Sequence, residues 1–186
     1  MALPDIIQKE SEEVEAEFIS IINENQVLTY RLTPREMQVL ELYAKGSYNK
    51  EIAERLVISG HTVKHYSSNI LQKLKARNRV HAVHKATIEG ILPEEAEKQE
   101  LTLTPAQARS VFYRAHGYSD KETAEKLELH EGTIRDFSYY ARKRNDYITT
   151  GRLVYLATMQ YFKNCPVALT EKGEITLKYN SPIRQP

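Results

Sequence analysis

The sequence predicts an all-α protein built from two tandem four-helix units, and three observations support this fold class. Residues 32–74 and 103–145 align without a gap at an offset of 71, with 12 identities in 43 positions. Apolar residues in both copies recur three and four positions apart, as they do on one face of an α-helix. Helix start and stop signals also recur in both copies. Because only two copies occur at this long period, we interpret them as two small domains and not as a solenoid.

The first unit, residues 31–90, begins with a capped helix. Thr33 precedes Pro34, and Glu36 completes a capping-box pattern. Gly46 is placed to end this helix. A short second helix, a third helix capped by Ser59 and a fourth that starts near residue 78 are expected to follow. The residues expected to face the core are Met37, Leu40, Tyr43, Ala44, Ile52, Ala53, Leu56, Val63, Tyr66, Ile70 and Leu74.

The second unit, residues 103–164, repeats these signals from Thr104 onwards. Its last helix is more apolar than its counterpart, through Leu153, Val154, Leu156, Ala157, Tyr161 and Phe162. We interpret residues 91–102 as a linker, either extended or opening a short helix. In the C-terminal tail, residues 165–186, a small β-hairpin around Gly173 is one option.

Composition is typical of a soluble protein, and nothing in it argues for an oxidising compartment. Hydrophobic residues make up 41% of the 186 positions and charged residues 27%. There is no apolar run of the ~20 residues that a bilayer span requires. The single cysteine, Cys165, has no intrachain partner for a disulfide, and the acidic N-terminus does not resemble a signal peptide. We therefore expect a cytoplasmic location and no membrane partner.

Charge is distributed unevenly along the chain, although the net charge is only +1. Residues 1–30 hold 7 acidic groups and 1 basic group, and an amphipathic helix is expected over residues 5–25. Residues 31–92 hold 11 basic and 5 acidic groups. A basic excess of this kind favours a polyanionic partner, against the alternative of a local fluctuation in composition.

The order of helices in the first unit is that of a helix-turn-helix, in which a tight turn joins two helices and the second is longer and basic. Such a helix fits the major groove of double-stranded DNA, where its side chains meet base edges. Lysines, hydroxyls and amides around it neutralise or bind phosphates. The pattern predicts a recognition helix over residues 59–74 and double-stranded DNA as the partner.

Five strings carry a resemblance to a known family: L-T-P-R-E, G-x-x-N-K-E-I-A, T-V-K, N-I-L-Q-K-L and R-N-R-V-x-A. With them, residues 32–88 resemble the LuxR-type (GerE-like) DNA-binding domain of bacterial regulators, and residues 103–160 resemble it more weakly. The resemblance implies a sequence-specific transcriptional regulator whose fourth helix is the usual dimer surface.

The resemblance also implies roles for individual residues. The positions that it places toward the bases are Lys64, His65 and Ser68. The positions that it places against the DNA backbone are Lys50, Thr62 and Asn69. This sequence departs from the family at Tyr48, where a small hydroxyl residue is usual, and at Tyr66, where histidine is usual. Because Tyr66 falls on the apolar stripe, we interpret it as a packing residue.

The second unit keeps part of this set, and its candidate DNA-binding residues are Lys121, Thr133, Arg135, Tyr139 and Arg142. Arg135 replaces Lys64 and suits guanine. Asp136 replaces His65, and an acid at this position more often repels phosphate. Two alternatives stay open for this unit: it contacts DNA, or it is kept for dimerisation.

Other chemistry is not supported. The sequence has no glycine-rich phosphate loop, no G-x-S-x-G and no metal-ligand spacing, so we expect no enzymatic activity, no catalytic residue, no metal and no cofactor. A zinc site at His81, His84 and His65 is an alternative, but solvated helix histidines are favoured because no cysteine pair or carboxylate cluster joins them.

Three functional hypotheses remain. In the first, both units of one chain read two half-sites about one turn, roughly 34 Å, apart. In the second, only the first unit reads DNA and a homodimer binds a palindrome. In the third, the protein is an adaptor or anti-activator that binds RNA polymerase or another regulator and not DNA.

Overall fold

The computed structural model describes residues 32–93, 99–162, 167–169 and 175–177. The chain divides into two units, Met1–Thr33 and Pro34–Pro186, and every helix and strand described here lies in the second. The expected N-terminal helix over residues 5–25, Cys165 and the turn at Gly173 lie outside the described residues. None of the helices in the described ranges is long and apolar enough to cross a membrane.

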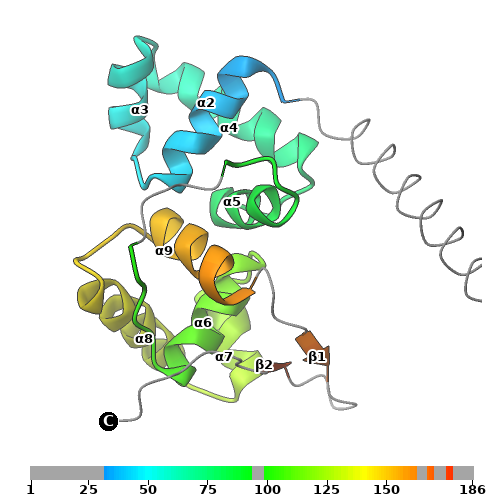
Figure 1. Ribbon diagram of the computed structural model, residues 1–186, viewed down its shortest axis with the longest axis vertical. Helices are drawn as coiled ribbons and strands as arrows, with labels where there is room; N and C mark the ends of the chain where they lie inside the picture. The colour runs from blue at the N-terminus through cyan, green and yellow to red at the C-terminus, as the bar shows by residue number, and fades with distance from the viewer. Residues whose placement is uncertain (1–31, 94–98, 163–166, 170–174, 178–186) are drawn as a thin grey trace, which may run out of the picture. The chain divides into compact units, whose positions relative to one another are not determined.

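In the part of the chain that the structure describes, the α-helices fall into two sets of four (Figure 1). The first repeat contains α2 (Pro34–Ala44), α3 (Asn49–Leu56), α4 (Gly60–Lys73) and α5 (Arg79–Ile88). The second repeat contains α6 (Pro105–Ala115), α7 (Asp120–Leu127), α8 (Glu131–Arg144) and α9 (Thr150–Ala157). Each helix of the second set begins 71 residues after its counterpart, so the offset in sequence is also an offset in structure. The last helix departs from this rule at its end, because η1 (Thr158–Phe162), a π-helical turn, continues α9.

Polar caps explain why paired helices start at equivalent positions. The Asn78 side chain accepts a hydrogen bond from the His81 N–H at 3.0 Å and opens α5. Thr149 stands at the equivalent position and accepts from the Arg152 N–H at 3.4 Å, opening α9. The change from Asn to Thr therefore preserves the helix start, since both side chains are good N-caps.

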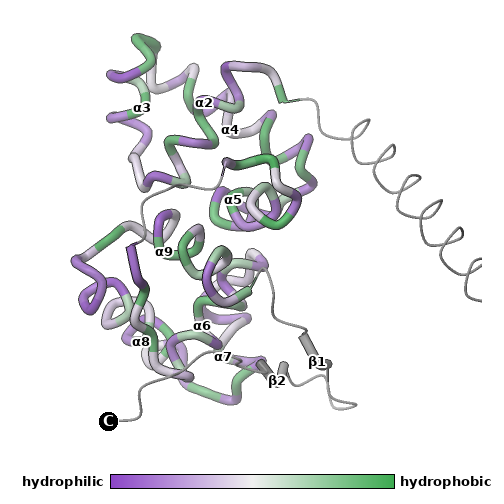
Figure 2. The backbone as a smooth tube through the Cα atoms, viewed as in Figure 1, coloured by the Kyte–Doolittle hydropathy of each residue, from purple (hydrophilic) through white to green (hydrophobic). Residues whose placement is uncertain are grey.

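The core of the first repeat follows the predicted apolar stripe. Leu40, Val63 and Ile70 are almost completely buried, whereas Met37, Ala53, Leu56 and Tyr66 are only half-buried. Hydrophobic and hydrophilic residues alternate along the helices in Figure 2, as expected where each helix has one buried side. The Glu36 carboxylate is also buried, and the Lys73 ammonium group lies 2.7 Å from it, so that this charge is paired across α2 and α4.

The two repeats share one core because α5 packs against α9. Figure 1 shows these two helices side by side, between α2–α4 on one side and α6–α8 on the other. Helix α5 also contacts α6 and η1, and α2 contacts α9. The buried residues of α5 and α9 include Ala82, Val83, Ala86, Leu153, Val154 and Ala157. Small side chains among them allow the two helix backbones to approach closely.

The described ends of the segment 91–102 are anchored to α9 and η1. Leu92 and Leu101 are each 4% exposed. The Tyr155 hydroxyl donates to the Pro93 carbonyl at 2.8 Å, and the Gln160 side chain accepts from the Leu101 N–H at 2.9 Å. The segment therefore adds to the packing of the second repeat on both sides of residues 94–98.

Asn145 closes α8 in a way that the repeat pattern does not indicate. It occupies the position equivalent to Leu74, yet it is also buried. Its side chain accepts from the Thr102 N–H at 2.8 Å and donates to the Thr102 and Ala141 carbonyls at 3.0 and 2.7 Å. A buried amide is stable here because its hydrogen bonds are made.

Two short strands lie near the C-terminus. Strand β1 (Val167–Leu169) pairs antiparallel with β2 (Ile175–Leu177), with Ala168 opposite Thr176. Both strands fall within the C-terminal tail, residues 165–186.

A histidine cluster lies between the repeats, and it corrects the expectation of solvated histidines. His84 on α5 is 3% exposed, its ring lies 4.6 Å from that of His116, and its Nδ1 is 2.9 Å from the Thr158 hydroxyl. Burial, then His116 and His81, lowers the pKa of His84 to about 3. Burial, then Lys85, His116 and Arg77, lowers the pKa of His81 to about 4. Within the described ranges, no group of three or more His, Cys, Asp or Glu side chains is arranged so that it could hold a metal ion.

These lowered pKa values make stability depend on pH. The unfolded chain takes up protons on His81 and His84 near pH 6.5, but the folded protein resists this until about pH 4 and 3. The free energy of unfolding is therefore at its full value above pH 6.5 and falls as the pH drops, for His84 by on the order of 2 kcal/mol at pH 5. Urea unfolding at pH 7.5, 6 and 5 measures this. His84→Gln should have a flatter profile, and an equally steep profile in that variant would contradict the assignment.

Candidate nucleic-acid interface

Helix α4 has one buried side and one exposed side. Val63, Ile70 and Leu74 point into the core, and each contributes roughly 1.5–3 kcal/mol through its burial. Lys64 and His65 are exposed. Three further candidates on α4 are exposed or half-buried: Thr62, Ser68 and Asn69. The structure thus places all the candidates of this helix away from its core side.

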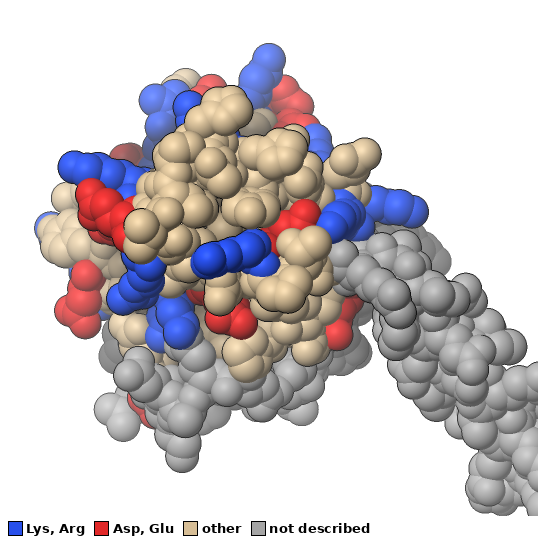
Figure 3. All heavy atoms as spheres, turned by 90° about the horizontal axis from the view of Figure 1, so that it is seen from above, with Lys and Arg blue, Asp and Glu red and all other residues tan. Residues whose placement is uncertain are grey.

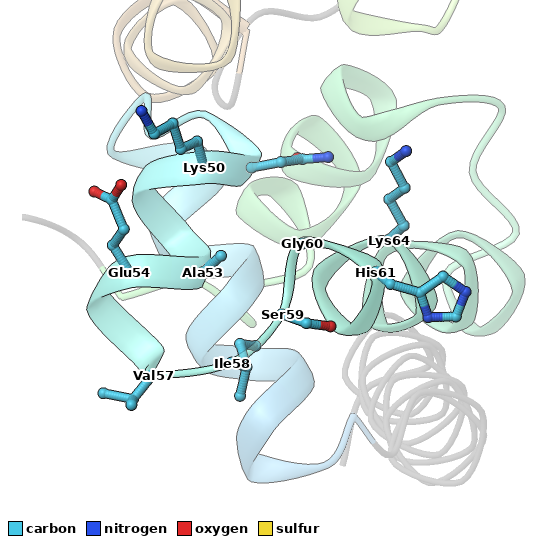
Figure 4. Close-up of a pocket in the computed structure, with 10 residues that line it drawn as sticks. Lys50, Ala53, Glu54, Val57, Ile58, Ser59, Gly60, His61 and Lys64 are labelled. Atoms are coloured by element: carbon cyan, nitrogen blue, oxygen red, sulfur yellow. The ribbon is translucent and has the colours of Figure 1, made fainter.

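The turn between α3 and α4 frames a shallow hollow that joins candidates from both helices. Its lining includes Lys50 and Glu54 from α3 and His61 and Lys64 from α4. Figure 4 shows the side chains of Lys50 and Lys64 pointing to the same side, away from the turn. Val57 closes α3 in a left-handed conformation (φ 54°) and is almost fully exposed. This arrangement places the side chains of two lysines from different helices on one side of the hollow.

The start of α4 is held by its own side chains. Ser59 accepts a hydrogen bond from the Thr62 N–H at 3.0 Å, and the two hydroxyls lie 2.8 Å apart. One turn further, the Asn69 amide nitrogen lies 3.4 Å from Nε2 of His65. Each of these contacts joins residues three or four positions apart in the sequence.

A polar network that the sequence did not single out fixes the four helices of the first repeat. The Tyr43 hydroxyl on α2 donates to Oδ1 of Asn49 at 3.0 Å and hydrogen-bonds Ser67 on α4. Asn49 on α3 also accepts from Arg79 of α5 at 2.8 Å, and the Arg79 guanidinium lies 5.2 Å from the centre of the Tyr43 ring. Asn49 belongs to the N-K-E-I-A string and Arg79 to the R-N-R-V string. The strings therefore contained both residues, but they did not reveal that the two side chains hydrogen-bond each other.

The second repeat replaces this network with an ion pair. Arg114 stands at the position of Tyr43 and Asp120 at that of Asn49, and their side chains form a salt bridge. Ser138, the counterpart of Ser67, has a buried hydroxyl with no hydrogen-bond partner among the described residues. The same helix arrangement is thus held by different chemistry.

The exposed side of α8 differs from that of α4. Arg135 is exposed and lies 2.9 Å from Glu131, one turn earlier, with Asp136 beside it. Lys121 is exposed on α7, and Thr133 is half-buried. Arg142 donates through Nε to the Ile148 carbonyl at 2.9 Å, so its side chain holds the end of the helix.

Three tyrosines gather on the outside of the second repeat. Tyr139, Tyr140 and Tyr147 are 49%, 53% and 57% exposed. The Tyr139 ring meets the Tyr140 ring at 5.3 Å and the Tyr147 ring at 6.4 Å, both edge-on. Exposed rings in contact with each other form a surface able to pack on a partner.

Charge around the first repeat is mixed. Figure 3, which looks onto the side of α2, α3 and α4, shows Lys and Arg side chains interspersed with Asp and Glu. The basic excess of residues 31–92 is therefore not one continuous patch on that side. An anionic partner is indicated by individual lysines such as Lys50 and Lys64.

The helices α3 and α4, their tight turn and the exposed side of α4 define a helix-turn-helix domain. More particularly, residues 30–86 match the family described as "Bacterial regulatory proteins, luxR family", so this segment is a LuxR-type (GerE) helix-turn-helix domain. The matched segment ends within α5.

Curated relatives are similar over the same length of chain. The transcriptional regulatory protein DesR of Bacillus subtilis is 48% identical over 59 residues, which are 32% of this chain and 30% of that protein. The nitrate/nitrite response regulator protein NarL of Escherichia coli is 46% identical over 61 residues, 31% of this chain and 28% of NarL. The oxygen regulatory protein NreC of Staphylococcus carnosus is 41% identical over 61 residues, 33% and 28% of the two chains. The match spans less than a third of each relative's length. No solved structure gives a significant match.

Removing the Tyr43 hydroxyl tests the network that holds α3 against α4. We expect Tyr43→Phe to lower the free energy of unfolding by about 1 kcal/mol, because Asn49 and Ser67 each lose a buried partner. Tyr48→Phe is the matched control, since Tyr48 is 59% exposed and its loss should change stability by less than about 0.5 kcal/mol. Urea unfolding of both variants decides, and equal stabilities would contradict the role given to Tyr43.

Proposed function

We propose that this protein binds double-stranded DNA with α4 in the major groove and regulates transcription. The observation that carries the proposal is the LuxR-type domain, in which Lys64 and His65 are exposed on α4 and Lys50 lines the same hollow as Lys64. Lys64 and His65, with Ser68, face base edges. Lys50, with Thr62 and Asn69, contacts the phosphate backbone.

The second repeat either binds a second half-site or mediates dimerisation. Its candidates for DNA contact are Lys121, Thr133, Arg135, Tyr139 and Arg142. Arg142 lies at the end of α8, where its guanidinium group donates a hydrogen bond to the Ile148 carbonyl.

A non-DNA-binding adaptor is the second candidate, and the exposed tyrosines favour it. Tyr139, Tyr140 and Tyr147 form an aromatic surface, and tyrosine is enriched where proteins meet. The partner in that case is RNA polymerase or another regulator. The two functions differ in whether any duplex sequence is preferred.

Selection of bound sequences from a random duplex pool, at fixed salt, tests DNA recognition. We expect the wild-type chain to enrich a defined sequence and Lys64→Ala to lose it, with binding to the wild-type site weakened by about 1–3 kcal/mol, or 5- to 150-fold. Lys50→Ala should weaken binding to all duplexes alike and lower the salt slope by about one.

Lys45→Ala is the matched control, because Lys45 is an exposed lysine at the end of α2 and outside the α3–α4 hollow. It should enrich the wild-type sequence. If the wild-type chain enriches no sequence at all, the DNA-binding function is wrong and the adaptor takes its place.

A further inference from the structure

The packing between the repeats is reciprocal. Helix α5 lies on α9, and these two helices are counterparts at the offset of 71 residues. Helix α2 contacts α9, and its counterpart α6 contacts α5. An interface in which two surfaces exchange places in this way is the isologous type that two-fold symmetry produces.

Two equivalent glycines show the same exchange in detail. A Cβ on Gly46 would lie 2.5 Å from the Thr149 hydroxyl oxygen and 3.2 Å from Cβ of Arg152. A Cβ on Gly117 would lie 2.9 Å from Nδ1 and 3.1 Å from Cβ of His81. Gly46 and Gly117 are counterparts, as are His81 and Arg152. Each glycine has a positive φ and admits the first turn of the other repeat's last helix.

Side chains lock this arrangement on the side of Gly117. Asn78 donates through Nδ2 to the Gly117 carbonyl at 3.1 Å. Arg77 lies 2.5 Å from Glu122 and 4.9 Å from the centre of the Tyr118 ring. The helix packing between the repeats is thus close to two-fold symmetric. These polar contacts, in contrast, lie on the side of Gly117.

We propose that a single chain is the complete DNA-binding unit, in which the internal two-fold arrangement brings α4 and α8 to two half-sites of one duplex. The inference rests on the proposed function of α4. A duplex has a two-fold relation between its strands, and a two-fold protein matches it with one recognition helix in each half-site. The packing surfaces of α5 and α9 cover each other, so a second copy cannot use them unless the repeats separate.

The two half-sites differ in sequence, because the exposed positions of α4 and α8 differ in chemistry. The counterparts are Lys64 and Arg135, His65 and Asp136, Ser68 and Tyr139, and Asn69 and Tyr140. Helix α8 thus replaces two small polar side chains with exposed rings and a histidine with a carboxylate. Rings suit the apolar thymine methyl group, and a carboxylate accepts from the cytosine amino group. The chain recognises a site without a palindrome.

The decisive experiment measures the mass of the complex between the 186-residue chain and its selected duplex by native mass spectrometry, together with the selected sequence. We expect one chain per duplex and a two-part sequence with unlike halves at one fixed spacing. Inserting about five base pairs, half a turn, between the halves should weaken binding at least ~10-fold. Two chains on a palindrome would overturn this inference and leave the proposed DNA function intact, whereas failure to enrich any sequence would overturn both.

Two variants separate the half-sites from the packing. The double variant Tyr139→Ser with Tyr140→Asn gives α8 the residues that α4 has at the equivalent positions. It should change only the second half of the selected sequence.

Gly151→Ala places a Cβ 2.7 Å from the Tyr43 carbonyl oxygen while favouring the helix. It should therefore loosen the packing between the two repeats and reduce the loss of binding caused by the five inserted base pairs. An unchanged second half in the first variant would overturn the inference.

Discussion

The packing of α5 against α9 is the constraint on which the rest of the described structure depends. Each four-helix repeat is small, and its last helix buries residues against the last helix of the other repeat. Ala86 and Val154 are completely buried where the repeats meet. Burying two such faces against each other removes both from water, and this gives a chain of two small domains one shared core. The burial of His84 and the close fit of Gly46 and Gly117 both occur where the two repeats meet.

The two repeats have helices at equivalent positions, although the polar chemistry between those helices differs. In the first repeat, a tyrosine hydroxyl and an arginine meet at Asn49. In the second repeat, the guanidinium group of Arg114 forms a salt bridge with the carboxylate of Asp120. Both solutions link the helices through polar side chains, although the buried Ser138 hydroxyl of the second repeat has no hydrogen-bond partner among the described residues. The helix arrangement at this point therefore tolerates a change of residue type.

Much of the fold and part of the candidate interface were predictable, for identifiable reasons. Caps such as Ser59 and Asn78 act through neighbours within three residues, so local sequence reveals them. The exposure of Lys64 and His65 follows from the helical spacing of Val63, Ile70 and Leu74. The burial of Asn145 was not predictable, because its partner Thr102 lies 43 residues away. The prediction of solvated histidines was wrong for a similar reason, because His84 is buried by residues of the other repeat.

The sequence by itself determined which segments are helical, where most of them begin, that the set occurs twice, and that residues 30–86 are a LuxR-type domain. These features are local or repeated, so the spacing of apolar residues and short sequence motifs are enough to predict them. Only the tertiary structure decided that the repeats pack through α5 and α9, that Tyr43, Asn49, Ser67 and Arg79 form one network, and that the outer surfaces of α4 and α8 differ in chemistry at matched positions. Contacts between distant residues depend on where whole helices lie, and no local pattern in the chain records that.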